Sequence, residues 1–254
     1  MLSCENLMLS VPGRVLCRSV TFALEPGQLW AVLGRNGSGK TTLVNALAGL
    51  RADARGAVNL NGDPLSSIAN RQRAREIGVL LQLEDTDFWG SVLEYVLLGR
   101  FPHARSWFGW RREDETSARA ALEAVDLAPL AQRGFATLSG GERQRARIAQ
   151  VLAQEPRCFL LDEPLQHLDL GHQVRTLDLF QRLAREEGRA VVMVLHDALW
   201  PARFCTDALL IYDDGNTLAG PAREALTRVN LERVYGCALA ELTQGEGRYF
   251  IPNV

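Results

Sequence analysis

The chain has 254 residues, of which 47% are hydrophobic, and its 28 basic and 30 acidic side chains leave a formal charge of -2. This length allows one sizeable core with at most a smaller attached subdomain, and the composition is that of an ordinary globular protein. The charge balance excludes a global basic field, so nucleic acid is not an expected partner.

The cysteines and the apolar runs exclude further classes. The five cysteines, at positions 4, 17, 158, 205 and 237, are scattered and lack CxxC spacing. This pattern indicates reduced thiols rather than a disulfide framework or a zinc site. Glu5 and Asn6 come too early for a signal peptide, and no apolar run approaches the roughly 20 residues that cross a bilayer. We therefore expect any membrane role to come through a partner.

The first part of the chain predicts antiparallel strands around a buried strand and a helix. Residues 5–25 and 56–62 resemble antiparallel strands with turns rich in Gly, Pro and Asn. Between them, "GQLWAVLGRNGSGKTTLVNALAGL" predicts a buried strand, a glycine turn and a helix. The expected apolar face of that helix comprises Leu43, Ala46, Leu47 and Leu50.

The remainder predicts an α/β domain with a helical insertion. "RCFLLDEP" and "AVVMVLHD" are continuous apolar runs that flank a helical segment at 171–187, a pattern typical of a mostly parallel sheet covered on both faces. We expect a single domain. Its predicted parts are a core of residues 1–87 and 157–219, a helical subdomain over 88–156, and a C-terminal helix and strand over 220–254.

A phosphate loop follows the first buried strand. Gly34, Gly39, Lys40 and Thr41 match G-x-x-x-x-G-K-[ST] between a strand and a helix, which indicates a P-loop NTPase of the RecA-like class rather than a structural glycine turn. Its backbone N–H groups would cradle phosphate, Lys40 would reach the β and γ phosphates of ATP, and Thr41 would help hold Mg²⁺. The expected nucleotide-binding residues here are Gly34, Arg35, Asn36, Gly37, Ser38, Gly39, Lys40, Thr41 and Thr42.

Two acids end the apolar run "RCFLLDEP". Asp162 is placed to bind Mg²⁺, directly or through water. Glu163 is the better candidate for deprotonating the attacking water, because that role needs a carboxylate that the metal does not occupy. A solvated pair of acids at a strand end is the alternative interpretation, and the phosphate loop argues against it.

A second glycine-rich helix start lies at "ATLSGGERQRARIAQ", residues 136–150. Ser139 and Glu142 fit a capping box, and Ile148, Val151 and Leu152 would form the buried stripe of the helix. Pure capping does not explain the glycine pair, because glycine costs about 1 kcal/mol relative to alanine inside a helix. The pair therefore predicts close approach of a phosphate to this turn.

These motifs together resemble those of ATP-binding-cassette ATPases. "LSGGERQ" at 138–144 resembles the family signature and lies between the phosphate loop and "LLDEP". Gln82 in "VLLQ" resembles the Q-loop glutamine, Asp169 in "HLDL" the D-loop aspartate, and His196 in "VLHD" the switch histidine. The resemblance covers essentially the whole chain, whereas His167 and His172 have no metal-site companions and are expected to be surface or structural residues.

The resemblance implies a site shared by two copies arranged head to tail. Ser139, Gly140 and Gly141 of one copy would cap the γ-phosphate of the ATP bound by the other. Gln82 would sense Mg²⁺ and the γ-phosphate, His196 would contact the γ-phosphate, and Asp169 would order the dimer seam.

One loop departs from the family pattern. Most members place an aromatic residue in the early loop, where it stacks on adenine, but "LSVPGRV" offers Val11, Pro12 and Arg14 instead. Phe22 lies in a strand-like segment and is expected to be core. We therefore expect Val11 and Arg14 to contact the base.

The motif set favours a transport subunit. No long heptad insertion separates the motifs, which argues against repair-type relatives, and a single set argues against the tandem translation factors. We expect an ATPase at the cytoplasmic face of the inner membrane that powers a separate permease and meets a substrate-binding protein only indirectly. Segment 92–103, "VLEYVLLGRFPH", resembles importers of iron-siderophore, haem and cobalamin, with cobalamin or ferric siderophore expected ahead of haem. An exporter, or a cassette acting on nucleic acid or the ribosome, is the alternative.

Aromatic residues concentrate after Gln82 and suggest where the permease docks. The region between Gln82 and Trp110 contains Phe88, Trp89, Tyr95, Phe101, Trp107, Phe108 and Trp110. We expect Tyr95 and Phe101 to belong to the core of the helical subdomain. The cluster in "RSWFGWRRED" is flanked by glycine and charges, so we expect part of it to be exposed as a partner surface.

Overall fold

The computed structural model describes residues 1–51, 53–82, 88–104, 109–245 and 247–253. A six-stranded sheet in the order β10-β9-β3-β8-β7-β6 forms its centre. The strands are parallel except β10, which pairs antiparallel with β9. Their bounds are β3 (Leu29–Gly34), β6 (Ile77–Leu80), β7 (Cys158–Asp162), β8 (Ala190–Val194), β9 (Asp207–Ile211) and β10 (Thr217–Pro221). The mostly parallel sheet predicted from the apolar runs is confirmed.

The two faces of this sheet belong to two apolar cores. On one face, alternate residues such as Ala31, Leu161 and Met193 pack with α6 (Leu170–Glu187) and the helical subdomain. On the other face, Val32, Leu160 and others pack with α1 (Lys40–Leu47) and an antiparallel sheet. Both faces are covered, which explains why β3, β7, β8 and β9 are buried at every position.

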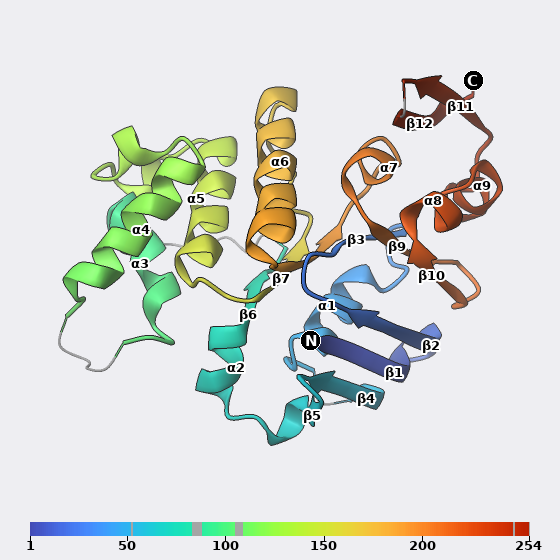
Figure 1. Ribbon diagram of the computed structural model, residues 1–254, viewed down its shortest axis with the longest axis horizontal. Coiled ribbons are helices and arrows are strands. Elements are labelled where there is room, and N and C mark those ends of the chain that lie inside the picture. The colour runs from blue at the N-terminus through green and yellow to red at the C-terminus, as the bar shows by residue number, and fades with distance from the viewer. Residues whose placement is uncertain (52, 83–87, 105–108, 246, 254) are drawn as a thin grey trace.

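The antiparallel sheet lies beside α1 at the lower edge of Figure 1. It has the order β2-β1-β4-β5, with β1 (Leu2–Val11), β2 (Arg14–Leu24), β4 (Arg55–Leu60) and β5 (Asp63–Pro64). This confirms the predicted N-terminal β subdomain. Phe22 is buried as expected, with its ring 4.9 Å from that of Trp30. The prediction for Leu50 is wrong: α1 ends at Leu47, and Leu50 lies beyond the turn at Gly49 with 57% of its surface exposed.

The helical subdomain stands to one side of the sheet (Figure 1). Its elements are α3 (Val92–Leu97), η2 (Leu98–Arg100), α4 (Arg112–Ala124), η3 (Ala128–Leu130), η4 (Phe135–Thr137) and α5 (Gly140–Ala153). Before it, η1 (Leu65–Ser67) and α2 (Asn70–Glu76) lead from the antiparallel sheet to β6. Tyr95 is buried as predicted and stacks on Phe135 with 4.0 Å between ring centroids. Phe101 was expected in this core, but it is 56% exposed and contacts Trp110 instead; Trp107 and Phe108 lie outside the described residues.

The C-terminal part differs from the predicted single helix and strand. Residues 220–254 contain α8 (Ala222–Ala225), α9 (Arg228–Tyr235) and a hairpin of β11 (Leu239–Gln244) with β12 (Gly247–Pro252). The short helix α7 (Pro201–Phe204) precedes them, between β8 and β9. β10 continues past residue 219, so the central sheet extends slightly beyond the predicted boundary of the core. All five cysteines lie within the described chain and are unpaired, with Cys4, Cys17 and Cys158 buried and Cys237 exposed. Among the described residues, no helix is both long enough and apolar enough to span a bilayer.

Candidate nucleotide-binding and catalytic site

The predicted site residues meet at one edge of the central sheet. β3 ends at Gly34, β7 at Asp162 and β8 at Val194, and these three parallel strands are neighbours. Their carboxyl ends therefore place the phosphate loop, the two acids and His196 side by side. A cavity of about 540 Å³ opens there, lined by Val11, Arg14, Leu16, Asn36, Gly37, Gly39, Lys40, Thr41, Thr42, Gln82, Glu163, Gln166 and His196.

The phosphate loop owes its shape to glycine. Gly39 caps α1 with a φ of 107°, and an added Cβ would lie 2.9 Å from the Cβ of Leu16, so only glycine fits without strain. Lys40 is buried, and its ammonium donates hydrogen bonds to the carbonyl oxygens of Gly34 at 2.7 Å and Arg35 at 3.0 Å. Burial lowers the pKa of Lys40, and the nearby charges of Glu163 and Asp162 oppose that shift. The loop thus holds a desolvated cation where an anionic ligand would offset its cost.

Asp162 is a buried carboxylate without a sound hydrogen bond. Neither of its side-chain oxygens has a partner of good geometry among the described residues. Burial raises the pKa of Asp162, and the adjacent Thr41 hydroxyl opposes the shift. Buried polar atoms in proteins are nearly always satisfied, so orphaned oxygens point to a missing ligand. An oxygen-rich pair of Asp162 and Thr41 fits a hard cation such as Mg²⁺.

Glu163 lies at the centre of the polar cluster. One carboxylate oxygen is 2.7 Å from Nε2 of His196, and the other accepts a long hydrogen bond of 3.5 Å from the amide of Gln82. Glu163 is buried and has a φ of 54°, an uncommon conformation for a residue other than glycine, which occurs most often at functional sites. The structure therefore brings together Gln82, Glu163 and His196, three residues expected to be catalytic.

The Ser139 turn has the predicted capping box. The Glu142 amide donates to the Ser139 hydroxyl at 3.3 Å, and the Ser139 amide donates to the Glu142 carboxylate at 2.8 Å. A Cβ on Gly141 would lie 3.0 Å from the His167 carbonyl oxygen, so tight packing within the chain already favours glycine there. A Cβ on Gly140 would meet His167 carbons at 3.7 and 3.8 Å, which is ordinary contact. Packing within the chain therefore favours glycine at position 141 but does not require it at Gly140.

The turn is not part of the phosphate-loop cavity. Of the described residues that line that cavity, none comes from Ser139, Gly140 or Gly141. Asp169 is also elsewhere: it caps α6 by accepting from the His172 amide at 2.8 Å, and the same hydrogen bond lowers the pKa of Asp169. Val11 and Arg14, by contrast, do line the cavity as predicted for base contacts.

Other residues at the site carried no role in the sequence interpretation. The buried amide of Gln144, on α5, donates to the carbonyl oxygens of Glu163 at 3.3 Å and Pro164 at 3.1 Å. Arg147 donates to the carbonyl oxygen of Leu81 at 2.6 Å, next to Gln82. The signal for Gln144 was its place on the buried side of α5, where an amide needs partners. Tyr235, on α9, lines an adjoining cavity with Arg14, Asn36 and His196, and no local pattern pointed to it.

Comparison with known proteins identifies the family. The family model described as ABC transporter matches residues 17–166. The chain belongs to the ABC transporter family. Its similarity to the ferric enterobactin transport ATP-binding protein of Escherichia coli (strain K12) is 38% identity over 91% of this chain and 86% of that protein. A hemin import ATP-binding protein of Pseudomonas putida is 42% identical over 90% of this chain and 92% of that protein.

Solved structures of other proteins have the same fold as this ABC ATPase. An ABC transporter of the metal-chelate type, in an inward-facing conformation, matches with a TM-score of 0.86 and 31% identity over 100% of this chain and 97% of that chain. A dimeric bacterial ABC transporter cassette matches with a TM-score of 0.78 and 25% identity over 88% of this chain and 99% of that one. A post-hydrolysis state of that cassette contains ADP and phosphate. The ATPase assignment predicted from the motifs is confirmed.

Replacing the orphaned carboxylate should stabilise the ligand-free ABC ATPase. Because burial holds the pKa of Asp162 above its unfolded value, the stability linked to this carboxyl is fully present below about pH 3.9 and is lost as the pH rises through the folded pKa. We expect Asp162→Asn to melt a few degrees higher at pH 7, with the difference shrinking towards pH 4. Calorimetry across this range measures it, with Asp63→Asn at an exposed position as the control. A lower melting temperature of the Asp162→Asn variant at pH 7 would contradict a destabilising effect of the Asp162 charge.

Proposed function

We propose that this ABC ATPase hydrolyses ATP between two copies of itself and powers the uptake of an iron chelate through a separate membrane permease. The relatives named above support the substrate class, and so does an iron(3+)-hydroxamate import ATP-binding protein of Bacillus subtilis (strain 168), 34% identical over 92% of this chain and 87% of that protein. These names favour ferric siderophore or haem, so we place both ahead of cobalamin. We place the subunit at the cytoplasmic face of the membrane, held there by the permease.

The phosphate loop and its neighbours would bind the nucleotide. Backbone N–H groups of the loop and the start of α1 would bind the anionic phosphates, and Lys40 would exchange its carbonyl partners for phosphate oxygens. Thr41, Gln82 and Asp162 are the residues that would hold Mg²⁺, which when bound neutralises charge on the phosphates. Val11 and Arg14 would contact the base from the mouth of the cavity.

One observation carries the catalytic proposal: Glu163 is fixed between His196 and Gln82. A general base must be oriented towards the water that it deprotonates and must keep its charge free of the metal. The 2.7 Å contact with His196 fixes one oxygen of Glu163, and the long contact with Gln82 leaves the other weakly held. Glu163 would take the proton of the attacking water, and His196 would stay within reach of the γ-phosphate.

The Ser139 turn would complete the pocket of a second copy. The turn is a helix start that does not line the nucleotide cavity of its own chain, and the amide of Gly140 at the first position of α5 has no intrahelical acceptor. Such a start favours a phosphate from outside the chain. The dimeric cassette of similar fold supports this arrangement. Asp169 would lie near the seam between the two copies.

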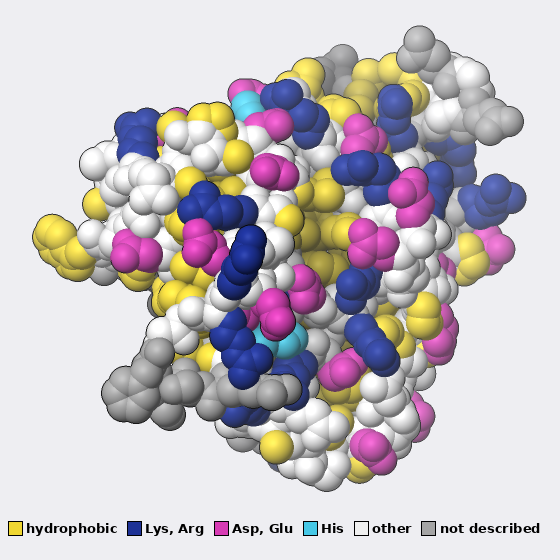
Figure 2. Space-filling view, turned by 60° about the vertical axis from the view of Figure 1, so that its left-hand side comes forward, with side chains coloured by type: hydrophobic (Ala, Val, Ile, Leu, Met, Phe, Trp, Pro, Cys, Tyr) yellow, Lys and Arg dark blue, Asp and Glu magenta, His cyan; other side chains and the backbone are white. Residues whose placement is uncertain are grey.

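The permease would dock beside the exposed aromatic residues of the helical subdomain. Trp89 is 91% exposed, and Phe101 packs edge-on against Trp110 at 5.1 Å between ring centroids. Phe88 differs, because its ring lies 5.4 Å from that of Tyr95 and 5.8 Å from that of Phe135 in the subdomain core. Figure 2 shows hydrophobic side chains reaching the surface of the helical part. Within the described part of region 82–110, Trp89 is therefore the sharper docking candidate.

Replacing the proposed base tests hydrolysis. Glu163→Gln keeps a partner for His196 but cannot accept a proton, so it should bind ATP, lose turnover by at least about a hundredfold and accumulate as an ATP-bound dimer. Phosphate release and light scattering with ATP or ADP measure these effects. Turnover at the parent rate would remove Glu163 from the base role.

Gly140 gives the cleanest test of the shared pocket. Gly140→Ala adds a methyl group that the chain itself can accommodate, so melting temperature and ADP affinity should stay close to the parent values. The methyl would obstruct a phosphate held by the second copy, and we expect turnover to fall by about tenfold or more. Steady-state hydrolysis, together with ADP titration, checks both parts. Full turnover would argue against a role for the turn in the partner's pocket.

Trp89 tests permease docking. Because its side chain is almost wholly exposed, Trp89→Ala should leave the fold and basal hydrolysis intact while it lowers transport in vesicles containing the permease. Phe88→Ala is the comparison, since loss of its core contacts should destabilise the subdomain by about 2 kcal/mol. Transport that stays fully coupled to hydrolysis in the Trp89 variant would refute the docking site.

A further inference from the structure

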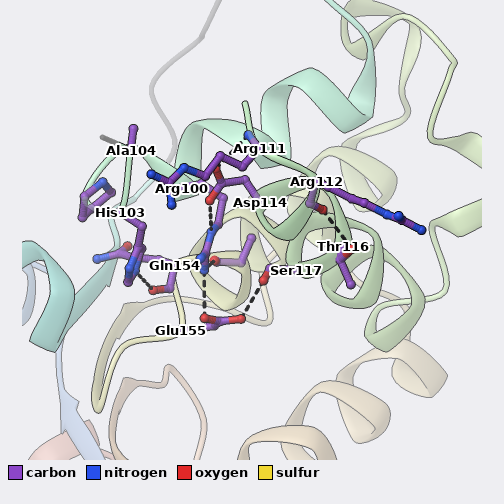
Figure 3. Close-up of polar contacts among 12 residues, drawn as sticks. Arg100, His103, Ala104, Arg111, Arg112, Asp114, Thr116, Ser117, Gln154 and Glu155 are labelled. Atoms are coloured by element: carbon purple, nitrogen blue, oxygen red, sulfur yellow. Dashed lines mark hydrogen bonds and ion pairs between the residues drawn. The ribbon is translucent and has the colours of Figure 1, made fainter. Parts of the chain in front are cut away.

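A cluster of polar and charged residues around a buried arginine–aspartate pair lies at the C-terminal end of α5, the helix that begins at the Ser139 turn. Figure 3 shows Arg100, His103, Asp114, Gln154 and Glu155, which we call the Arg100 junction. Arg100 and Asp114 have only 7% and 4% of their surfaces exposed. A buried arginine is rare unless all its donors are paired, so this cluster calls for a physical explanation.

Arg100 caps α5 while it pairs with α4. Its Nε donates to the Asp114 carboxylate at 3.1 Å, and its Nη1 donates to the Ala153 carbonyl oxygen at 2.7 Å. The same Nη1 lies 2.9 Å from the carboxylate of Glu155. Ala153 is the last residue of α5, where carbonyls lack helical partners and a cation is favoured. The planar fork of arginine can serve these partners together, which a lysine cannot.

Asp114 and Glu155 extend the junction into α4. Asp114 accepts from the Arg111 amide at 3.1 Å, so the carboxylate that binds Arg100 also caps the start of α4. Ser117, one turn further along α4, donates to Glu155 at 2.8 Å. Partial burial of Glu155 raises the pKa of its carboxyl, but hydrogen bonds from Ser117 and Arg100 outweigh this effect and lower the pKa. Glu155 therefore stays charged beside the guanidinium at neutral pH.

His103 and Gln154 join the junction to the central sheet. Nε2 of His103 lies 2.9 Å from the Gln154 carbonyl oxygen, and the Gln154 amide donates to the carbonyl oxygens of Ala74 and, at 2.9 Å, Ile77. Ile77 begins β6, the strand that leads to Gln82. The end of α5 is thus bonded to the base of the strand that precedes Gln82.

The chain around Arg100 is also bonded to α2 and pressed against α5. Arg71 and Arg75 on α2 both donate to the Pro102 carbonyl oxygen, at 3.0 and 2.9 Å. A Cβ on Gly99 would overlap the Gln150 carbonyl oxygen, so this segment lies directly on the backbone of α5. Segment 99–103 can therefore shift only together with the end of that helix.

We propose that Arg100 is a positioning residue for the Ser139 turn. α5 has 14 residues and spans about 21 Å, so fixing its C-terminal end sets where its N-terminal turn points. Gln144 and Arg147 bond the first half of α5 to the backbone beside Glu163 and Gln82, and the Arg100 junction bonds its far end to α2 and β6. Two fixed points along one helix determine its axis. The inference rests on the proposed function, because only a second copy would use the turn.

The experiment separates positioning from stability. In a Glu163→Gln background, we compare Arg100→Lys, the isosteric double variant Arg100→Met with Asp114→Leu, and Arg119→Met as a control. Arg119 also pairs with an acid of α4, Glu115, but in an exposed position. Three quantities are measured: melting temperature, ADP affinity of the monomer, and the protein concentration at which ATP drives dimer formation.

We expect ADP affinity to stay near the parent value while dimer formation weakens. Apolar replacement of a buried pair often preserves stability, but Asp114 also caps α4, so the double variant should lose at most a few degrees of melting temperature and should keep its ADP affinity. The double variant lacks the bonds to Ala153 and Glu155, so its dimer formation should need about tenfold more protein. Arg100→Lys should need a similar excess, because lysine cannot bind all the partners of Arg100 at once. Arg119→Met should match the parent.

Two results would overturn the inference. If the double variant keeps the parental ADP affinity and also dimerises like the parent, Arg100 does not position the turn. If ADP affinity falls together with dimer formation, the junction supports the whole fold rather than the turn. A Glu163→Gln parent that never dimerises with ATP would instead refute the shared pocket itself, and with it this use of α5.

Discussion

The parallel pairing of β3, β8 and β7 is the constraint on which the site depends. Each strand ends at the same edge of the sheet, and each is followed by a different piece of chemistry: a glycine loop, an acid pair or a histidine. No two of these pieces are neighbours in sequence, so only the register of the sheet brings them together. Because the strands are buried on both faces, a slip in register would disrupt two cores at once.

The site is charged where the surrounding protein is apolar. Lys40 is held by carbonyl oxygens and Asp162 by no sound hydrogen bond among the described residues, so the ligand-free state bears a desolvation cost. Selection for stability alone would remove this cost, whereas a bound phosphate and a cation would offset it by supplying the missing partners. The same logic distinguishes the Arg100 junction, whose buried guanidinium has its partners within the chain and needs no ligand.

Local patterns in the sequence predicted the strands, the phosphate loop and the capping box, because each depends on residues a few positions apart. Resemblance to the family supplied Gln82 and His196, which no pattern would have selected. What escaped prediction depends on contacts across long stretches of chain. Leu50 is the exception, because Gly49 is a local helix-stop signal that ends α1 before it. Phe101 lies in segment 99–103, whose bonds to α2 leave its ring outside the subdomain core. Periodicity carries no information about such packing, nor about Tyr235 reaching the nucleotide site from α9.

The distribution of thiols offers a way to observe two copies closing. Burial raises the pKa of Cys4 and Cys158 to about 12 and that of Cys17 to about 11. Burial also raises the pKa of the partly buried Cys205, so these four thiols resist alkylation, whereas Cys237 is exposed. Cys237 directly follows Gly236, where an added Cβ would lie 3.9 Å from the Arg35 guanidinium of the phosphate loop. A maleimide fluorophore would therefore attach to the native chain preferentially at this position. Energy transfer between two such labels would then follow nucleotide-driven association without an engineered cysteine.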